Sequence, residues 1–378
     1  MSDHLHQALF GSRFSRRAFL TASTAACFGL PFGRSVSAAQ TPETRRKPAR
    51  STVLFFLCGG ASHIDMWDMK PDAPAEYRGD FRPVRTSSPD IQLCEHLPML
   101  AKNAHRFSLV HGVTDFGRAT GDHHAGYYYN LTGHAPDPSF KQLGNDRRPF
   151  ANDWPHMGCV VGMRVKGSEK MPGVITLPHK PSKAPYTRPG QFAGRLGLEF
   201  DPFFLNGSFE RPLEFSSPTL SFSEGVSPER IQDRKSILEA VSAMRRELDH
   251  DAAVRNYTHQ QQRAFALLSA GGTAGAFDIK QESAKTLERY GPSINATSLV
   301  MARRLVEAGV PFITVFWKEN EAIANRCKSA GGWDTHASNF ACLKEYLLPE
   351  FDRCFSAFLE DVGERGLLDR IRPLNYIP

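Results

Sequence analysis

The sequence predicts an α/β protein built on a mostly parallel sheet with a helical insertion. Two short apolar runs, at residues 52–58 and 310–317, are rich in β-branched and aromatic residues and do not alternate polar with apolar positions, which is typical of buried parallel strands. Between them, strands and helices give way to a long helical stretch and then return, an order that favours α/β over α+β. We therefore expect one α/β domain over residues 52–378.

The remaining elements follow from local signals. Ser227 and Pro228 are the N-cap and first residue of a predicted helix. A stripe of apolar residues, one turn apart, continues along it to Leu248. Gly309 ends another predicted helix directly before the second key strand. Further helices are expected at 97–105, 252–270, 279–290 and 297–308, and further strands at 107–113 and 173–177.

The first 39 residues have the features of an N-terminal export signal, and we do not expect them to be part of the folded domain. The run S-R-R-A-F-L from Ser15 matches the twin-arginine export pattern, and small residues at 37–39 suit a signal peptidase. We expect residues 1–39 to be a twin-arginine signal peptide recognised by the export machinery, and residues 40–51 to be a linker. The protein is then exported to the periplasm or beyond, and no later run is long enough to be a membrane span.

Composition is that of an ordinary globular enzyme. Hydrophobic residues make up 41% and charged residues 23% of the chain, and the formal net charge is +6. Much of that excess lies in the predicted signal peptide, so binding to nucleic acid has little support. The six cysteines beyond the signal peptide permit disulfides in an oxidising compartment, but their pairing stays open. Cys58, inside a predicted strand, is expected to be a small buried hydrophobe.

Aspartate and histidine crowd the segments that follow the two key strands. These segments are G-G-A-S-H-I-D-M-W-D at 59–68 and G-G-W-D-T-H at 331–336. In open α/β sheets, ligands bind beyond the carboxyl ends of the strands, so we expect both segments to meet in one cavity. Carboxylate and imidazole without cysteine suit a divalent metal of the Zn, Mn, Mg or Ca kind. The candidate metal ligands are His63, Asp65, Asp68, Asp334 and His336.

A third segment, G-D-H-H-A-G at 121–126, lies at the centre of a dense group of histidines. A helix that begins near His123 would direct its N-terminal amides at the same sheet edge, where they could bind phosphate or sulfate. We therefore take His123 and His124 as candidate catalytic residues. The alternative is that either one is a hydrogen-bonded structural histidine.

Together these motifs resemble a known family. The strings F-L-C-G-G-A-S-H-I-D-M-W-D-M-K-P, G-D-H-H-A-G-Y-Y-Y-N-L-T-G, A-R-R-L-V-E-A-G-V-P-F-I-T-V and G-G-W-D-T-H-A-S-N-F are similar to an uncharacterised family of exported bacterial proteins, domain of unknown function 1501. That family is grouped with the alkaline phosphatase and sulfatase superfamily. The resemblance covers residues 52–369. It implies an alkaline phosphatase/sulfatase-like three-layer sandwich with a mostly parallel sheet, helices on both faces and one or two metals at the strand tips.

The resemblance also implies roles for single residues. Asp65 corresponds to the metal-binding aspartate after the first strand, with Asp68 and His63 as nearby substitutes, and Asp334 and His336 correspond to later ligands. His123 stands ten residues before Gly133, where sulfatases carry a nucleophilic Cys or Ser. Metal ligation fits a neutral imidazole best, while transient phosphorylation of His123 or a different chemistry stays open.

The C-terminus departs from the family pattern. Relatives continue into another strand, a G-E-F-G-R-type turn and a D-H-W element, whereas this chain ends in R-I-R-P-L-N-Y-I-P from Arg370. Such an ending resembles a frameshifted or truncated gene. We therefore expect a sheet strand and the last metal ligands to be missing, a neighbouring strand edge to be open, and metal binding to be poor. Inactivity is one possible consequence.

Two functions are consistent with these sequence features. The first is an exported metal-dependent hydrolase of phosphate or sulfate esters, acting on a small-molecule or polymer ester substrate. The alternative is a non-catalytic exported binding protein on the same sulfatase-like scaffold. The motifs of serine hydrolases, P-loop proteins and zincins do not occur in the sequence.

Overall fold

The computed structural model describes residues 49–118, 121–165, 167–168, 171–183, 186–217 and 275–376. The chain divides into two units, Met1–Arg46 and Lys47–Pro378. The predicted signal peptide, most of the predicted linker and the two helices expected between residues 228 and 270 lie outside the described residues.

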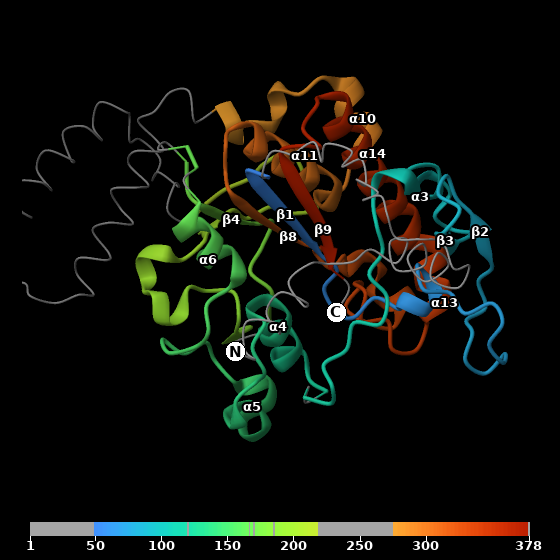
Figure 1. Ribbon diagram of the computed structural model, residues 1–378, viewed down its shortest axis with the longest axis horizontal. Coiled ribbons are helices and arrows are strands. Elements are labelled where there is room, and N and C mark those ends of the chain that lie inside the picture. Colours follow the sequence, from blue (N-terminus) through green and yellow to red (C-terminus); the bar gives the residue numbers. More distant parts are fainter. Residues whose placement is uncertain are drawn as a thin grey trace, which may run out of the picture. The chain divides into compact units, whose positions relative to one another are not determined.

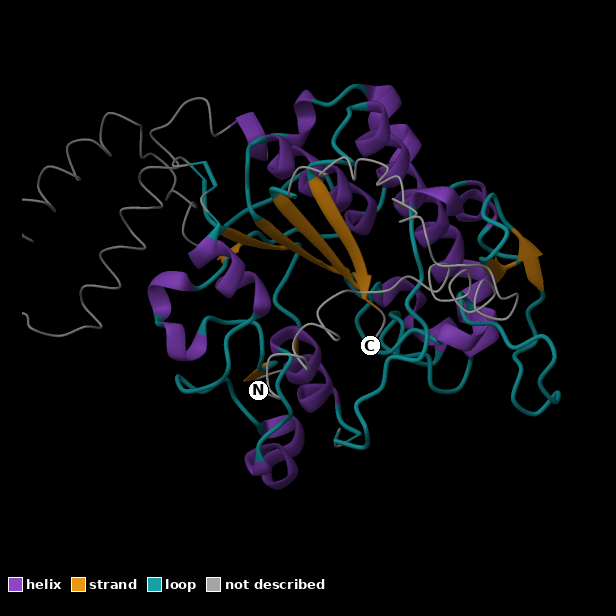
Figure 2. Ribbon diagram, in the orientation of Figure 1, coloured by secondary structure: helices purple, strands orange, loops and turns teal. Residues whose placement is uncertain are grey.

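The described part is an α/β fold on a parallel sheet of five strands in the order β7-β4-β8-β1-β9 (Figures 1 and 2). Three of these strands confirm the strands predicted at 52–58, 173–177 and 310–317. β4 and β8 are buried throughout and β1 nearly so, in agreement with their apolar sequences. The strands are β1 (Ser51–Phe56), β4 (Val174–Leu177), β7 (Phe203–Phe204), β8 (Phe312–Phe316) and β9 (Ile371–Tyr376).

The strand that we expected to be missing at the C-terminus is present. β9 pairs with β1 along its whole length, from Ser51 opposite Ile371 to Phe56 opposite Tyr376. The prediction of an open edge at β1 was therefore wrong. Strand pairing uses backbone groups, so an unfamiliar sequence can supply it. Pro373 lacks an N–H and is compatible with β9 because β9 is the last strand in the sheet order.

Helices cover both faces of the sheet, which gives three layers (Figures 1 and 2). On one face, Val53 and Phe55 join the core formed by α11 (Ile294–Glu307) and α14 (Leu348–Glu364). On the other face, Leu54 and Phe56 pack against α4 (His123–Thr132) and α6 (Met157–Arg164). Adjacent residues of a strand point to opposite faces, so an uninterrupted apolar run is needed to fill both layers.

Three of the remaining predicted helices are confirmed in full or in part, and one predicted strand is not. Helix 297–308 is confirmed by α11, 97–105 by α3 (Pro98–Lys102) and a 3₁₀ turn at Ala104–Arg106, and 279–290 in part by α10 (Ala284–Tyr290). The strand predicted at 107–113 was wrong, because this segment joins no sheet. Both edges of β1 are already occupied by β8 and β9. The smaller elements are β2 (Pro83–Arg85), β3 (Gln92–Cys94), α5 (Pro138–Leu143), β5 (Ser182–Lys183), β6 (Tyr186–Thr187), α12 (Ala324–Cys327), α13 (Asn339–Cys342) and a π-helical segment at Leu343–Leu347.

A disulfide joins Cys327 at the end of α12 to Cys342 at the end of α13. It closes a loop of 15 residues in sequence separation that contains the whole 331–336 motif. Cys58 is buried and free, as the sequence predicts. Within the described residues, no helix is both long and apolar enough to cross a membrane.

A charged network connects the helices on the α11 face. The Arg303 side chain on α11 is only 1% exposed. Its guanidinium donates hydrogen bonds to Asp361 on α14 at 3.0 Å, to Glu307 at 2.8 Å and to Glu282 at 2.6 Å. Tyr290 on α10 also donates to Asp361, at 2.9 Å. The buried Arg303 guanidinium, whose three nitrogens all have acceptors, therefore joins α11 to α14, and Tyr290 adds α10 through the same Asp361.

Candidate functional site

The two motif segments meet beyond the carboxyl ends of β1 and β8. Gly59, after β1, approaches Asp334 so closely that a Cβ at position 59 would lie 2.6 Å from the Asp334 amide nitrogen. A second contact joins the segments, because Asn339 Nδ2 donates to Asp65 Oδ2 at 3.0 Å. The predicted meeting of segments 274 residues apart is present. The roles assigned to individual residues stay predictions.

Asp334 is the centre of a carboxylate–imidazole group that also includes His123 and His336. Asp334 Oδ2 lies 2.9 Å from His123 Nε2, and Asp334 Oδ1 lies 2.8 Å from His336 Nε2. His123 is the first residue of α4, whose N-cap Asp122 accepts a hydrogen bond from the Ala125 amide. The three side chains are 37%, 35% and 70% exposed for His123, Asp334 and His336, so a ligand can reach them from solvent.

Glu319, three residues after β8, adds a second carboxylate at this edge. Burial by surrounding protein raises its pKa, and the negative charge of Asp334 raises it further, against the opposing effects of Arg188, His123 and Lys318. The Glu319 side chain is nevertheless exposed to solvent, which screens the charges that act on it. The sequence analysis missed Glu319, although its position after a strand is the same signal that identified Asp65.

His124 lies behind His123 on α4 and is completely buried. Neither of its ring nitrogens has a hydrogen-bond partner among the described residues. Burial lowers the pKa of His124 to about 4, and the nearby positive charge of Arg188 acts in the same direction. Asn145 is close enough to favour the charged ring, but among the described residues its own Oδ1 also has no hydrogen-bond partner. His124 is thus a neutral imidazole at neutral pH.

Arg188 is a functional candidate that the sequence analysis missed, because no recognised motif surrounds it. Its guanidinium lies over the Tyr127 ring, 4.9 Å from the centroid, and its buried Nη1 has no acceptor in the described part of the chain. Beneath it, burial raises the pKa of the Cys58 thiol to about 12. Cys58 is therefore not a nucleophilic thiolate at neutral pH.

Asp65 lies apart from the Asp334 group. It ends a 3₁₀ turn (His63–Asp65), is 3% exposed, and accepts a hydrogen bond from Ser62 Oγ at 2.6 Å. Its Oδ1 has no hydrogen-bond partner within the described residues, and a Cβ at Gly79 would lie 1.7 Å from that oxygen. Asn339, which binds Asp65, also accepts from Thr335 Oγ1 at 2.7 Å. Asp65 is thus linked to the 331–336 segment through Asn339.

Asp68 and His63 belong to a third location. Asp68 pairs with Lys70 at 2.6 Å and with His111 at 2.9 Å. Burial acts to raise the pKa of Asp68, but the hydrogen bonds from Lys70 and His111 outweigh it, so the pKa is lowered. His63 is exposed. The structure therefore distributes the seven predicted site residues over three places, and brings together His123, Asp334 and His336 with His124 close by.

The donor atoms of the Asp334 group fit a divalent ion in chemical type. Across the described ranges, no set of three or more His, Cys, Asp or Glu side chains is arranged as a ready metal site. The contacts of 2.8 and 2.9 Å between Asp334 and its histidines suit hydrogen bonds. Two ligands about 2.1 Å from one ion and at right angles to each other are also about 3 Å apart. Binding of an ion would require these side chains to exchange their hydrogen bonds with Asp334 for contacts with the metal.

Comparison with known proteins gives one family. A family model described as "Protein of unknown function (DUF1501)" matches residues 49–371. No curated protein and no solved structure matches the chain. The matched range includes all three motif segments, Arg188 and Glu319, so the whole sheet-edge arrangement lies within the part that the family model covers.

Proposed function

The chain belongs to the family described as "Protein of unknown function (DUF1501)", and we propose that it is a metal-dependent hydrolase of phosphate or sulfate esters. The observation that carries this proposal is the His123–Asp334–His336 group beside two buried donors without partners among the described residues, Arg188 Nη1 and the His124 ring. Buried polar groups are normally hydrogen-bonded, so unsatisfied groups at a strand-tip site indicate a ligand. Imidazole, guanidinium and carboxylate suit a metal together with an anionic ester.

His123, Asp334 and His336 would hold the ion. A divalent ion at such a site polarises a phosphoryl or sulfuryl oxygen and lowers the pKa of water. Arg188 would bind an oxygen of the anionic group, and the first amides of α4 would face the same charge. His124 would supply one neutral hydrogen bond without bringing a charge into the buried layer. Each role follows from where the side chain lies and what it can donate or accept.

Glu319 would serve as the proton donor to the leaving oxygen. A carboxyl group with a raised pKa keeps its proton closer to neutral pH and is a better general acid than an ordinary glutamate. The negative charge of Asp334 contributes to that raised pKa. An ion bound to Asp334 would reduce this smaller contribution and would leave burial, the larger cause, to keep the pKa of Glu319 raised.

The fold supports a relationship with the alkaline phosphatase and sulfatase superfamily. A parallel sheet covered by helices on both faces, with aspartate and histidine beyond its carboxyl ends, is the architecture that the motif resemblance implies. A crystal structure of the metal-loaded protein tests this relationship. An ion bound by Asp334 at the strand tips supports it, whereas an ion held elsewhere contradicts it.

Export through the twin-arginine route is part of the same proposal. The S-R-R-A-F-L run supports it, and so does the Cys327–Cys342 disulfide, since disulfides persist mainly in oxidising compartments. We expect Arg16→Lys combined with Arg17→Lys to keep the protein in the cytoplasm, as measured by cell fractionation. Unchanged export of this double variant would contradict the twin-arginine route.

The alternative function is non-catalytic binding. It is favoured by one observation, that α4 begins with His123 where a cysteine or serine nucleophile is expected. A binding protein would use Arg188 and His124 to hold an anion without cleaving it. Equilibrium binding of phosphate and sulfate, measured beside the activity assay below, separates the two functions.

The activity test uses a panel of phosphate and sulfate esters with Zn²⁺, Mn²⁺, Mg²⁺ or Ca²⁺. We expect Asp334→Asn to lower kcat/KM by at least about a hundredfold, the scale for loss of an essential metal ligand or electrostatic group. Asp68→Asn is the matched control, because the same change removes a carboxylate that pairs with Lys70 and His111 instead. Equal rates for wild type and Asp334→Asn, or no hydrolysis with any ion, would end the hydrolase proposal.

A further inference from the structure

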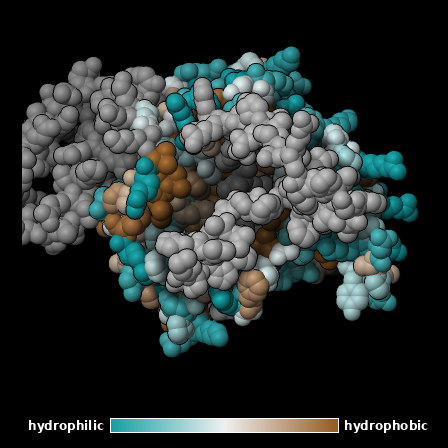
Figure 3. Space-filling model, viewed as in Figure 1, coloured by the Kyte–Doolittle hydropathy of each residue, from teal (hydrophilic) through white to brown (hydrophobic). Residues whose placement is uncertain are grey.

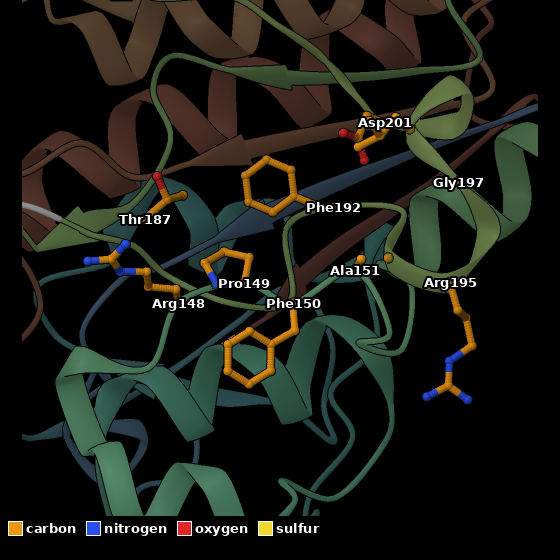
Figure 4. A pocket seen from close by; sticks show the side chains of 11 residues that line it. Arg148, Pro149, Phe150, Ala151, Thr187, Phe192, Arg195, Gly197 and Asp201 are labelled. Carbon is orange, nitrogen blue, oxygen red and sulfur yellow. The ribbon is translucent and has the colours of Figure 1, made fainter. Parts of the chain in front are cut away.

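A separate cavity of about 910 Å³ lies between residues 148–151 and 187–201 (Figure 4). None of the seven predicted site residues lines it. Its size is that of a site for a small organic molecule. Carbon-rich side chains dominate the lining, above all Phe150, Phe192 and Leu198. The cavity therefore suits an apolar ligand rather than a metal ion or a free phosphate.

The aromatic rings of this cavity are held in place before any ligand arrives. The Arg147 guanidinium lies 3.7 Å from the centroid of the Phe150 ring, and Arg147 is itself fixed by Asp153 at 2.9 Å. The Phe192 ring packs against Phe204 with centroids 5.8 Å apart. Preformed rings reduce the entropy lost on binding, so a flat ligand can stack on them at little conformational cost.

Charge divides the cavity into two ends. In Figure 4, the Arg148 and Asp201 side chains lie on opposite sides of the Phe192 ring. Asp201 Oδ1 accepts a hydrogen bond from the Ala193 amide at 2.7 Å. Burial raises the pKa of Asp201, although that hydrogen bond and the charge of Lys180 act against the shift. A ligand anion is attracted by Arg148, because the other guanidinium of the lining, that of Arg195, lies over the Trp154 ring at 3.7 Å from its centroid. At the Asp201 end a ligand hydroxyl would find an acceptor.

The rim of the cavity continues into an apolar surface. Leu198, which lines the cavity, is 56% exposed, and Val160 and Met163 on α6 are 39% and 36% exposed. Figure 3 shows hydrophobic side chains around the position of α6 on the face in view. An apolar rim favours a ligand that is mostly hydrocarbon, and disfavours a sugar, which would need many polar partners.

We propose that this cavity binds an aromatic acid of one or two fused rings, with its ring against Phe192, its anionic group toward Arg148 and a hydroxyl toward Asp201. This site is distinct from the ester site and does not depend on hydrolysis. The two sites adjoin in sequence, because Thr187 lines the cavity while Arg188 reaches Tyr127 on α4.

The test is a titration of the full chain with 6-hydroxy-2-naphthoate, followed by calorimetry. Two matched probes keep the 6-hydroxyl and remove one feature each: 6-(hydroxymethyl)-2-naphthol lacks the charge, and 6-hydroxydecalin-2-carboxylate lacks the flat ring. We expect Phe192→Leu to weaken binding about three- to tenfold, the range for one aromatic contact. Arg148→Gln should weaken binding of the acid but not of the alcohol. Asp334→Asn should leave the affinity unchanged.

Several outcomes would overturn the proposal: no saturable binding below about 1 mM, equal binding of acid and alcohol, an unchanged affinity in Phe192→Leu, or loss of binding in Asp334→Asn. Tighter binding of glucuronate than of the naphthoate would assign the cavity to a sugar instead and would also overturn it. Thermal unfolding checks that each variant is folded. If Phe192→Leu does not fold, Leu198→Ser on the exposed rim replaces it, with an expected loss of about threefold.

Discussion

Two groups of buried charged and polar side chains, on opposite faces of the sheet, are built in opposite ways. In the Arg303 network, each of the three guanidinium nitrogens donates to a carboxylate, on Asp361, Glu307 or Glu282. At the strand tips, Arg188 Nη1 and both His124 nitrogens have no such partner within the described residues. Burial of a polar atom without a hydrogen bond costs roughly 1–3 kcal/mol. The first group therefore stabilises the fold, whereas the second is arranged for something that the chain itself does not supply.

The two groups also differ in the direction of their pKa shifts. Burial acts to raise the pKa of both Glu282 and Asp361, but hydrogen bonds from Arg303, Arg304 and Arg365 outweigh it and lower both. At the strand tips, burial and Asp334 raise the pKa of Glu319. A network that lowers carboxyl pKa values is stable in its charged form, while a site that raises one can hold a proton for transfer.

The largest expected effect is on stability. Arg303→Met should lower the free energy of unfolding by about 3–5 kcal/mol, because it leaves buried carboxylates without their shared cation. Arg188→Met should change it by less than about 1 kcal/mol, since the lost contact with the Tyr127 ring and the lost attraction to Glu319 are offset by removal of a buried nitrogen that has no acceptor among the described residues. Urea denaturation measures both. The exposed Arg211, paired with Glu214 at 3.2 Å, gives the control Arg211→Met, expected to be near neutral. Equal destabilisation by the Arg303 and Arg188 variants would contradict the conclusion that the Arg303 network stabilises the fold and the strand-tip group does not.

The second prediction concerns the disulfide that holds the strand-tip segment. Cys327→Ser combined with Cys342→Ser should cost about 3 kcal/mol, the usual value for a loop of this length. The loss should affect the 331–336 segment more than the Arg303 network. Hydrogen exchange followed by mass spectrometry measures this difference. Faster exchange along α11 than at residues 331–336 would contradict it. Cys354→Ser, which changes a buried free cysteine, controls for the substitution itself.

The smallest expected effect comes from His124. His124→Leu should raise stability at pH 7 by about 1 kcal/mol, because two buried nitrogens without partners are removed, and should lower hydrolysis if the proposed site is correct. The sign of its pH dependence follows from a folded pKa of about 4 against an ordinary value of 6.5. Between these two pH values His124 is protonated in the unfolded chain and neutral in the folded chain. The free energy of unfolding therefore falls as the pH decreases from 6.5 toward 4.

The variant should reduce this acid slope without abolishing it. Burial also lowers the pKa of His156 to about 4 and of His179 to about 3, and these two histidines remain. Urea midpoints measured from pH 7 to pH 4 give the slope. An unchanged slope in His124→Leu would mean that its ring is not the buried neutral group described above.

The sequence predicted the central strands and the meeting of their tips, because uninterrupted apolar runs and the residues that follow them are local signals. It did not predict Arg188, whose position depends on how the irregular segment after β4 folds back onto α4. The sequence also placed Asp68 in the same candidate metal site as Asp334, although the two side chains have different partners in the structure. Only two residues lie between Asp65 and Asp68 in sequence, yet Asp65 binds Asn339 while Asp68 binds Lys70 and His111. Contacts of this kind are set by tertiary packing.

The error at the C-terminus has a different cause. The unfamiliar sequence after Arg370 predicts the loss of a strand, whereas backbone pairing with β1 accepts almost any extended segment at a sheet edge. The segment at 107–113 has a sequence that suits a strand, yet it joins no sheet. Strand propensity is a local property, while a place in a sheet is not.

Gly59 gives a marker that can be followed in other sequences. Its backbone lies in the left-handed region at φ +114°, and any side chain there would meet the main chain of Asp334. Alanine at this position would push the two polypeptide backbones apart. Homologues that keep the glycine can therefore retain this close approach, and those that have lost it must have rebuilt the loop around residue 334. The residue aligned with Gly59 would therefore show which family members can keep the close contact between this position and residue 334.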